Sequence, residues 1–567
     1  MRKAFFFVLI LFIFSCDTAK RAINVNPYQY SITKKVIAKN GAVVSAHPLA
    51  SKVGIEIMKQ GGNAIDAAIA TQLALAVVYP NAGNLGGGGF MVARLANGQT
   101  ITLDYREKAP LLAHRDMYLD QNGEVMQGKS VNGHLSSGVP GTVAGLFESA
   151  RYAKFSFKKL IQPAIDLAEK GFVITAREAT SLNSIQDELN EYNTRPSVFQ
   201  KKQAWKVGDT LTQHDLANTL KRIRDKGIKG FYEGKTAQLI VDEMKRGGGM
   251  ITLEDLKNYK AKWRAPHQFS YKGYTIIGMA MPSSGGTLLN QMLKMVEDKP
   301  LASYGFLSPQ AVQLMTEVER RAFADRAEFM GDADFYNVPV DKITSDAYLK
   351  ERMKDYEPGI AGNSKTTKAG VLPKESEETT HLSVIDAEGN AVAATTTLNN
   401  SYGSKTVVGG AGFFLNDEMD DFSVKPGVPN IYGAVGGEAN SIAPGKRMLS
   451  AMTPTVVLQN DQPFLVVGTP GGTTIPTSVF QTIVNIIDFR MSTEDAVYKP
   501  KFHHQWLPDR IDVEKSFPND TREALQKMGY KINERGNIGR VEVIKVLPDG
   551  SFEAVADNRG DDSAEGF

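Results

Sequence analysis

The sequence predicts an α+β protein, and three observations lead to this fold class. Residues 380–385 and 391–397 are two β-type runs around a turn-rich stretch, which predicts an antiparallel hairpin. Residues 90–94 and 99–105 predict a second hairpin around an Asn-Gly turn. Residues 157–262 instead carry amphipathic runs typical of helices. Hairpins and helices in separate stretches are typical of the α+β class.

Composition limits the classes of function. The chain has 567 residues, of which 42% are hydrophobic and 23% charged, so it can bury a large core. Lys and Arg number 65 against 63 acidic residues, a formal net charge of +2. This balance gives no sign of a nucleic-acid partner. Partners therefore have to be argued from sites.

Residues 1–16 are predicted to be a secretory signal. A basic start at residues 1–3 precedes an apolar run at residues 4–14, which is too short for a comfortable membrane span. Cys16, the chain's one cysteine, stands where a bacterial lipoprotein signal places its acylated residue. We expect an exported protein, periplasmic or in the outer envelope, anchored by lipid at Cys16. The alternative is a plain cleaved signal. Polar residues 17–40 suit a tether.

The next elements follow from apolar periodicity. Residues 42–45 predict a short strand, and residues 47–60 a helix with one apolar stripe. Asn63 caps a second helix at residues 64–78, which is apolar enough to be buried on most sides. The four-glycine stretch at residues 81–91 lacks a phosphate-binding pattern, so close backbone approach is the preferred interpretation.

Three features stand out in the middle region of the chain. Arg106, at the end of the second hairpin, can hold a carboxylate bidentately or be a solvated charge. A helix at residues 309–326 is interpreted as a salt-bridged face without a catalytic role. Residues 359–378 are loop-like and suit a flexible segment that delivers the chain to a scissile bond. The charged residues of that helix are Glu317, Glu319, Arg320, Arg321, Asp325 and Arg326.

The first hairpin gathers hydroxyl groups. With its turn centred on Glu388, Thr379 pairs with Thr397, and Asn399 follows Thr397 on the same face. A threonine hydroxyl needs a base, and no His-Asp pair is evident nearby. If the chain were cleaved just before Thr379, the new α-amino group, with a pKa near ~8, would be the base for its own Oγ. The alternative is a surface hairpin in which threonine is a good strand former.

Short motifs then run through nearly the whole chain after the leader. They are NAGNLGGGGFM (81–91), LDYREKAP (103–110), SGVPGTVAG (137–145), PSSGGT (282–287), RRAFADR (320–326), TTHLSVID (379–386), TTTLN (395–399), LNDEMDDFS (415–423), PGVPNIYGAVGG (426–437), KRMLSAMTPT (446–455) and GTPGG (468–472). In this order they resemble the γ-glutamyltranspeptidase family, also called glutathione hydrolase, among the N-terminal nucleophile hydrolases.

The resemblance implies a fold and an activity. The fold is a four-layer αββα sandwich, self-cleaved between Glu378 and Thr379 into two intertwined subunits, residues 41–378 and 379–567. Thr379 forms a γ-glutamyl-enzyme from glutathione or another γ-glutamyl compound and passes the group to water or to an amino acid or dipeptide acceptor. Neither a cofactor nor a metal is expected. Adjacent His503 and His504 cannot easily face one ion.

The resemblance also implies the site. Residues 464–467 predict a strand that leads into a glycine turn, which is either a plain tight turn or a pair of N–H donors for an oxyanion. The implied catalytic residues are Thr379, Thr397, Gly471 and Gly472. The implied substrate contacts are Arg106 and Ser450 for the α-carboxylate, Asn399, Glu418 and Asp421 for the α-ammonium, and Tyr432 as the closing aromatic of a lid at residues 426–437.

One position departs from the family pattern. The chain reads Ser450-Ala451 where the family often has two adjacent serines. The loss of one hydroxyl contact, about 1 kcal/mol, predicts weaker substrate binding. Two alternatives remain: a cephalosporin or glutaryl amide acylase of the same fold, which needs no ammonium site, and a non-catalytic, lipid-anchored binding protein, which would stay uncut.

Overall fold

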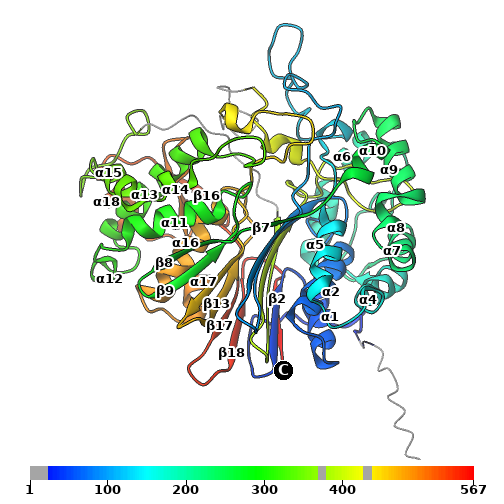
Figure 1. Cartoon of the computed structure of the whole chain (residues 1–567), viewed down its shortest axis with the longest axis horizontal. Helices are drawn as coiled ribbons and strands as arrows, with labels where there is room; N and C mark the ends of the chain where they lie inside the picture. The colour runs from blue at the N-terminus through cyan, green and yellow to red at the C-terminus, as the bar shows by residue number, and fades with distance from the viewer. Residues whose placement is uncertain (1–22, 24, 368–378, 426–436) are drawn as a thin grey trace, which may run out of the picture.

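Two seven-stranded antiparallel sheets lie face to face at the centre of the protein (Figure 1). The computed structural model describes residues 23, 25–367, 379–425 and 437–567. In sheet order, the first sheet consists of β1 (Lys35–Ala38), β18 (Phe552–Ala556), β17 (Glu542–Val546), β13 (Gln462–Gly468), β12 (Thr455–Gln459), β9 (Tyr274–Gly278) and β8 (His267–Tyr271). The second consists of β19 (Ser563–Gly566), β2 (Gly41–Ser45), β10 (Thr379–Asp386), β11 (Ala391–Thr397), β3 (Gly88–Arg94), β4 (Thr100–Asp104) and β7 (Lys262–Arg264).

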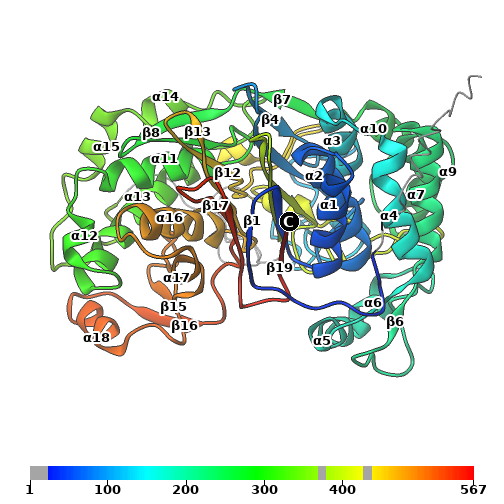
Figure 2. The same ribbon diagram turned by 90° about the horizontal axis from the view of Figure 1, so that it is seen from below.

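Helices cover the outer face of each sheet, as the view from below shows (Figure 2). On the second sheet lie α1 (Pro48–Lys59), α2 (Ala64–Val78), α3 (Thr142–Ser149), α4 (Phe157–Lys170), α5 (Ala176–Ser184), α6 (Gln186–Tyr192), α7 (His214–Lys226), α8 (Lys229–Tyr232), α9 (Gly234–Gly247) and α10 (Leu253–Asn258). On the first lie α11 (Gly285–Val296), α12 (Leu301–Tyr304), α13 (Pro309–Phe329), α14 (Val340–Ile343), α15 (Asp346–Arg352), α16 (Thr474–Ile487), α17 (Thr493–Tyr498) and α18 (Asn519–Lys527).

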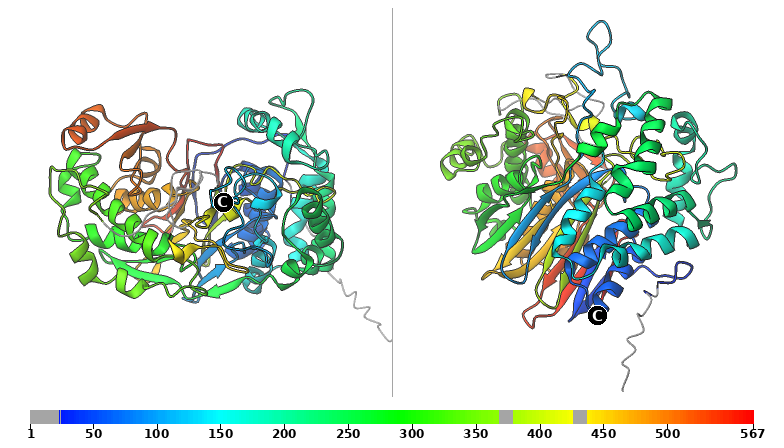
Figure 3. Two further views of the ribbon diagram at one scale, coloured as in Figure 1. Left: turned by 90° about the horizontal axis from the view of Figure 1, so that it is seen from above. Right: turned by 45° about the vertical axis from the view of Figure 1, so that its right-hand side comes forward.

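Three hydrophobic cores account for these four layers. Side chains alternate between the two faces of a strand, so each sheet can bury both. Val44 and Phe90 of the second sheet meet Ile277 and Val456 of the first in a core between the sheets. A separate core lies under the helices on each outer side. Figure 3 shows these helices on the two sides of the paired sheets. The predicted αββα sandwich is therefore confirmed.

The local signals for the first helices are confirmed. The Asn63 side chain accepts from the N–H of Asp66, and the Asp66 side chain accepts from the N–H of Asn63, which closes a capping box at the start of α2. All of α2 is buried, as its apolar composition predicts. The predicted hairpins form with β3 pairing β4 and β10 pairing β11.

One expectation is corrected. β1 lies inside the predicted tether of residues 17–40, yet it pairs with β18 and belongs to the first sheet. The predicted salt-bridged face of α13 is confirmed, and the structure adds that it is buried: Glu317 and Arg320 are 1% and 0% exposed. The spacing of charges along a helix predicts which residues form ion pairs, but it does not show whether that face of the helix is buried or exposed. Among the described residues, no helix combines the length and apolar character needed to cross a membrane.

Candidate active site

The open end of the β10–β11 hairpin brings two threonines together. The register pairs Thr379 with Thr397, as predicted, and their Oγ atoms are 3.4 Å apart. Both side chains are buried, at 4% and 3% exposure. The two hydroxyl groups are neighbours, and either can donate to the other.

Asn399 reaches the same place by a different route from the one predicted. β11 ends at Thr397, and Asn399 has a left-handed backbone, φ 76°, so it does not continue the strand face. Asparagine tolerates this conformation better than most residues. Its N–H donates to Thr397 Oγ at 2.8 Å, and its side-chain amide donates to the carbonyl of Asp417 at 3.0 Å.

The predicted site residues converge on one small cavity of about 10 Å³, roughly the room of a single water molecule. Of the predicted residues in the described part of the chain, all but Gly471 line it: Arg106, Thr379, Thr397, Asn399, Glu418, Asp421, Ser450, Ala451 and Gly472. Met452 and Ile475 complete the lining. Residues far apart in sequence are thus gathered at one end of the sandwich.

Arg106 lies at the centre of the polar side of this cavity. It follows β4, and its carbonyl accepts from the Tyr259 hydroxyl at 2.6 Å. Its guanidinium is 1% exposed and forms short ion pairs with Glu418 and Asp421. Glu107 Oε2 lies 3.4 Å from Arg106 Nη1. One buried cation therefore faces three buried carboxyl groups.

This charge balance perturbs the carboxyl groups. Burial raises the pKa of Glu418 to about 8, although the Arg106 charge opposes the shift. Burial likewise raises the pKa of Glu107 to about 8 against the Arg106 charge. Within the described part of the chain, Glu418 Oε1 and Glu107 Oε1 are buried without a hydrogen-bond partner. The cluster can accept a further cation or hydrogen-bond donor.

The glycine turn follows β13 and precedes α16. Gly471 and Gly472 have φ values of 135° and 56°, in the region that favours glycine. A Cβ on Gly471 would stand 2.4 Å from Thr474 Oγ. Gly472 lines the cavity beside Thr379, and Gly471 is its direct neighbour. The turn can therefore present backbone N–H groups toward the end of the hairpin that carries Thr379.

Replacing Gly471 by alanine tests whether this turn supplies N–H donors. We expect Gly471→Ala to lower kcat about tenfold with little change in KM. An alanine strains the backbone here and moves the N–H donors, which raises the activation free energy by about 1.4 kcal/mol. The measurement is steady-state kinetics on cleaved protein. Gly468→Ala is not a suitable control because it clashes with His381, whereas Gly550→Ala, at φ 82° in open space, controls for strain alone. An equal loss of kcat in Gly550→Ala would contradict the assignment.

Ser450 and Ala451 line the cavity with Arg106, which donates to the carbonyl of the preceding residue Leu449 at 3.3 Å. The N–H of Ser450 donates to the carbonyl of Pro282 at 2.9 Å, and the Ser284 hydroxyl donates to the carbonyl of Ser450 at 2.7 Å. The PSSGGT segment thus fixes the backbone at Ser450. Ala451 is 1% exposed and lines the same cavity as Arg106, Glu418 and Asp421.

Sequence reasoning assigned no role to three residues that shape the site. Glu107 is the third carboxyl group, and its place beside Arg106 in LDYREKAP was the available signal. Ser284 supports Ser450, as described above. Asn84 donates to the carbonyl of Thr397 at 2.8 Å and accepts from the N–H of Gly87 at 3.0 Å. A Cβ on Gly87 would stand 2.0 Å from that same carbonyl, so close approach at the glycine stretch is confirmed.

Three predicted residues lie outside the described residues: Cys16, Glu378 and Tyr432. Their predicted roles stay predictions.

The sequence matches the family model described as Gamma-glutamyltranspeptidase over residues 50–567. It is 44% identical over 562 residues to the glutathione hydrolase proenzyme of Escherichia coli (strain K12), covering 98% of this chain and 97% of that protein.

Solved structures give the same picture. A cephalosporin acylase from Bacillus halodurans matches with a TM-score of 0.84 at 27% identity, covering 96% of this chain and 99% of that one. A chain of Helicobacter pylori γ-glutamyltranspeptidase matches with a TM-score of 0.57 at 45% identity, covering 60% of this chain and 97% of that one. On the family model and the identity to a full-length relative, the chain belongs to the γ-glutamyltranspeptidase family.

Proposed function

We propose that this enzyme is a self-processing γ-glutamyltransferase and glutathione hydrolase whose nucleophile is Thr379. The observation that carries the proposal is the buried cluster of Arg106 with Glu107, Glu418 and Asp421 beside Thr379. A γ-glutamyl group has one carboxylate and one ammonium on its α-carbon. An arginine next to an excess of carboxylates matches both charges.

In the proposed complex, the charged groups of the substrate bind to the residues that form the ion pairs of Arg106. The α-carboxylate takes the Arg106 guanidinium and the Ser450 hydroxyl. The α-ammonium takes Glu418 and Asp421, with Asn399 nearby. Because burial raises the pKa of Glu418 to about 8, the arrival of an ammonium favours its ionised form and releases a proton near neutral pH.

In the proposed reaction the γ-glutamyl group is transferred twice, first to Thr379 and then to water or an acceptor amine. The α-amine of Thr379 takes the proton from Oγ, and Oγ attacks the γ-carbonyl carbon of the substrate. The oxyanion of the tetrahedral intermediate faces the N–H groups of Gly471 and Gly472. The C–N bond then breaks, and the leaving amine takes the proton. Water or an acceptor amine attacks the ester, which frees Thr379 again.

The proposed maturation uses the same hydroxyl. Thr379 Oγ attacks the carbonyl of Glu378, the peptide bond rearranges to an ester, and water hydrolyses the ester to free the α-amine. The large subunit would run to Glu378 and the small subunit from Thr379. Since β10 and β11 lie between β2 and β3 of the large subunit, the two products would share one sheet. We further propose export, with Cys16 as the lipid-anchored residue.

Ala451 is expected to weaken substrate binding. We expect Ala451→Ser to lower KM about fivefold for a γ-glutamyl substrate, because one added hydrogen bond contributes about 1 kcal/mol. Steady-state kinetics on γ-glutamyl-p-nitroanilide measures it. Ala393→Ser, a buried alanine of the inter-sheet core, controls for the burial of a hydroxyl. An unchanged or raised KM in Ala451→Ser would argue against a carboxylate contact at this position.

The acylase alternative is favoured by one observation, the structural match to a cephalosporin acylase. A glutaryl group has no α-ammonium, so it leaves Glu418 and Asp421 without a partner. Turnover of γ-glutamyl-p-nitroanilide against glutaryl-p-nitroanilide separates the two. We expect the γ-glutamyl amide to be hydrolysed far faster. Preference for the glutaryl amide would overturn the proposed function.

A further inference from the structure

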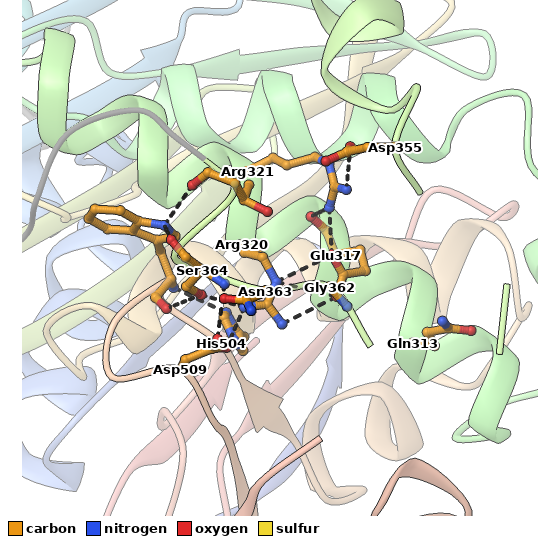
Figure 4. Close-up of polar contacts among 12 residues, drawn as sticks. Gln313, Glu317, Arg320, Arg321, Asp355, Gly362, Asn363, Ser364, His504 and Asp509 are labelled. Atoms are coloured by element: carbon orange, nitrogen blue, oxygen red, sulfur yellow. Dashed lines mark hydrogen bonds and ion pairs between the residues drawn. The ribbon is translucent and has the colours of Figure 1, made fainter. Parts of the chain in front are cut away.

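A cluster of polar side chains, most of them buried, holds residues 362–367, the last described stretch before the proposed cleavage site (Figure 4). We call Glu317, Arg320, Trp506 and Asp509 the anchor. Two of these residues belong to α13, and two lie in the loop between β14 (Phe502–His503) and β15 (Ile511–Glu514). The stretch itself has neither helix nor strand, as predicted. Its contacts nevertheless fix it in place.

The indole N–H of Trp506 forms hydrogen bonds with two carbonyl groups of residues 362–367. Trp506 Nε1 donates to the carbonyls of Ser364 and Thr367 at 3.0 and 2.9 Å. The Ser364 hydroxyl donates to the carbonyl of Trp506 at 2.5 Å, and the N–H of Ser364 donates to Asp509 Oδ2 at 2.9 Å. Ser364 and Thr367 are 2% and 4% exposed, although Lys365 between them is exposed.

Buried charges secure the same stretch from α13. Arg320, which is 0% exposed, forms short contacts with Asp509 and the Ser364 hydroxyl. Its Nε lies 3.2 Å from Glu317 Oε2, and Glu317 Oε1 accepts from the N–H of Gly362 at 3.0 Å. Burial opposes ionisation of Glu317, but Arg320 and Arg321 outweigh it and lower the pKa to about 2. The ion pairs therefore persist at neutral pH.

The backbone of Trp506 is held in an unusual conformation. Its φ of 69° is rare for a bulky side chain and costs about 1–3 kcal/mol, so it persists only where the surroundings fix it. The N–H of Trp506 donates to His504 Nδ1 at 3.1 Å. The other ring nitrogen of His504 lies 3.4 Å from Asp509 Oδ1, so a neutral imidazole links the two anchor residues. This geometry aims the indole N–H at residues 364–367.

We propose that the anchor is the fixed point from which the chain reaches its own cleavage site, and that Trp506 is a positioning residue for self-cleavage. The inference rests on the proposed function, because it assumes cleavage before Thr379. Trp506 lies in the proposed small subunit and Ser364 in the proposed large one. Their contact crosses the boundary that cleavage creates, so it also retains the upstream product.

Loop-closure entropy sets the expected size of the effect. The cost of bringing a bond to a reactive group rises with the number of residues from the last fixed contact. With the anchor, that contact is at Thr367. Without it, the next described contact upstream is at Ala361, whose N–H donates to the carbonyl of Met528 at 2.9 Å. For loss of the whole anchor, the longer connection predicts self-cleavage about twofold slower.

The test is a time course of self-cleavage after a short expression pulse, read on a denaturing gel. Trp506→Phe keeps the packed ring but removes the Nε1 donor. Trp205→Phe is the matched control, since Trp205 is 7% exposed and donates to the carbonyl of Phe199 at 3.1 Å, away from the anchor. We expect Trp506→Phe, but not the control, to slow cleavage by less than the twofold that loss of the whole anchor predicts, because the contacts of Ser364 with Asp509 and Arg320 remain. Turnover per cleaved molecule and the thermal midpoint should match Trp205→Phe.

A second variant tests whether slower cleavage of Trp506→Phe comes from a folding defect. Ser364→Ala removes the hydroxyl bonds to the anchor and leaves the indole intact, and it should slow cleavage in the same direction. Equal cleavage rates for Trp506→Phe, Ser364→Ala and the control would overturn the inference, as would a loss of turnover in step with cleavage. A wild-type chain that stays uncut would overturn the proposed function, and this is visible before the variants are compared.

Discussion

Thr379→Ala is expected to leave the chain in one piece and to lower turnover of γ-glutamyl amides by about 10³-fold or more. The variant removes the hydroxyl that attacks both the peptide bond and the substrate, and uncut protein has no α-amine to act as base. The fold should survive, because the substitution removes only a hydroxyl and a methyl group at the end of β10. Gel electrophoresis and a p-nitroanilide assay measure the two losses.

Thr380, the next residue along β10, supplies the control for Thr379→Ala. Thr380 is also buried on β10, but within the described residues its hydroxyl has no hydrogen-bond partner, so Thr380→Ala removes no bond. We expect Thr380→Ala to be cleaved and active, and Thr379→Ser to retain cleavage and turnover at reduced rates. Rapid turnover by Thr379→Ala would mean that another group is the nucleophile.

Glu418→Gln is expected to lower kcat/KM for γ-glutamyl-p-nitroanilide roughly a hundredfold. A neutral amide cannot complement the α-ammonium, and an uncompensated buried charge costs about 3 kcal/mol. Burial already raises the pKa of Glu418 to about 8, so glutamine resembles the protonated side chain of the empty site. Self-cleavage and thermal stability should therefore change little.

Two comparisons make this result specific. Glutaryl-p-nitroanilide carries no ammonium, so any turnover of it should be unaffected by Glu418→Gln. Asp420→Asn is the matched variant, because Asp420 lies on the same short helix and is 1% exposed, yet it bonds the Ser130 hydroxyl at 2.5 Å and is not among the residues that line the cavity. Equal losses on both substrates, or for both variants, would contradict the ammonium site.

Local patterns predicted much of the structure. The spacing of β10 and β11 around their turn gave the pairing of Thr379 with Thr397, because a hairpin register follows from its turn. The capping box at α2 and the close approach at the glycine stretch are likewise local. The layered fold and the gathering of Arg106 with Glu418 came from family motifs, since these residues are far apart in sequence.

Other features depend on tertiary packing and carried no local signal. The spacing of the α13 charges predicts ion pairs, but their burial depends on the segments that pack against them, among them the Asp509 loop and residues 362–367. β1 reads as part of a polar tether because it is an edge strand with two exposed residues. Asn399 leaves the strand because its backbone turns left-handed, which strand periodicity does not encode.

The most direct measurement is N-terminal sequencing of the smaller fragment of purified wild-type protein, together with its turnover of γ-glutamyl-p-nitroanilide. The account predicts two fragments, with the smaller one starting Thr379-Thr380-His381. A single uncut chain that still hydrolyses the amide, or a fragment that starts at any other residue, would contradict it.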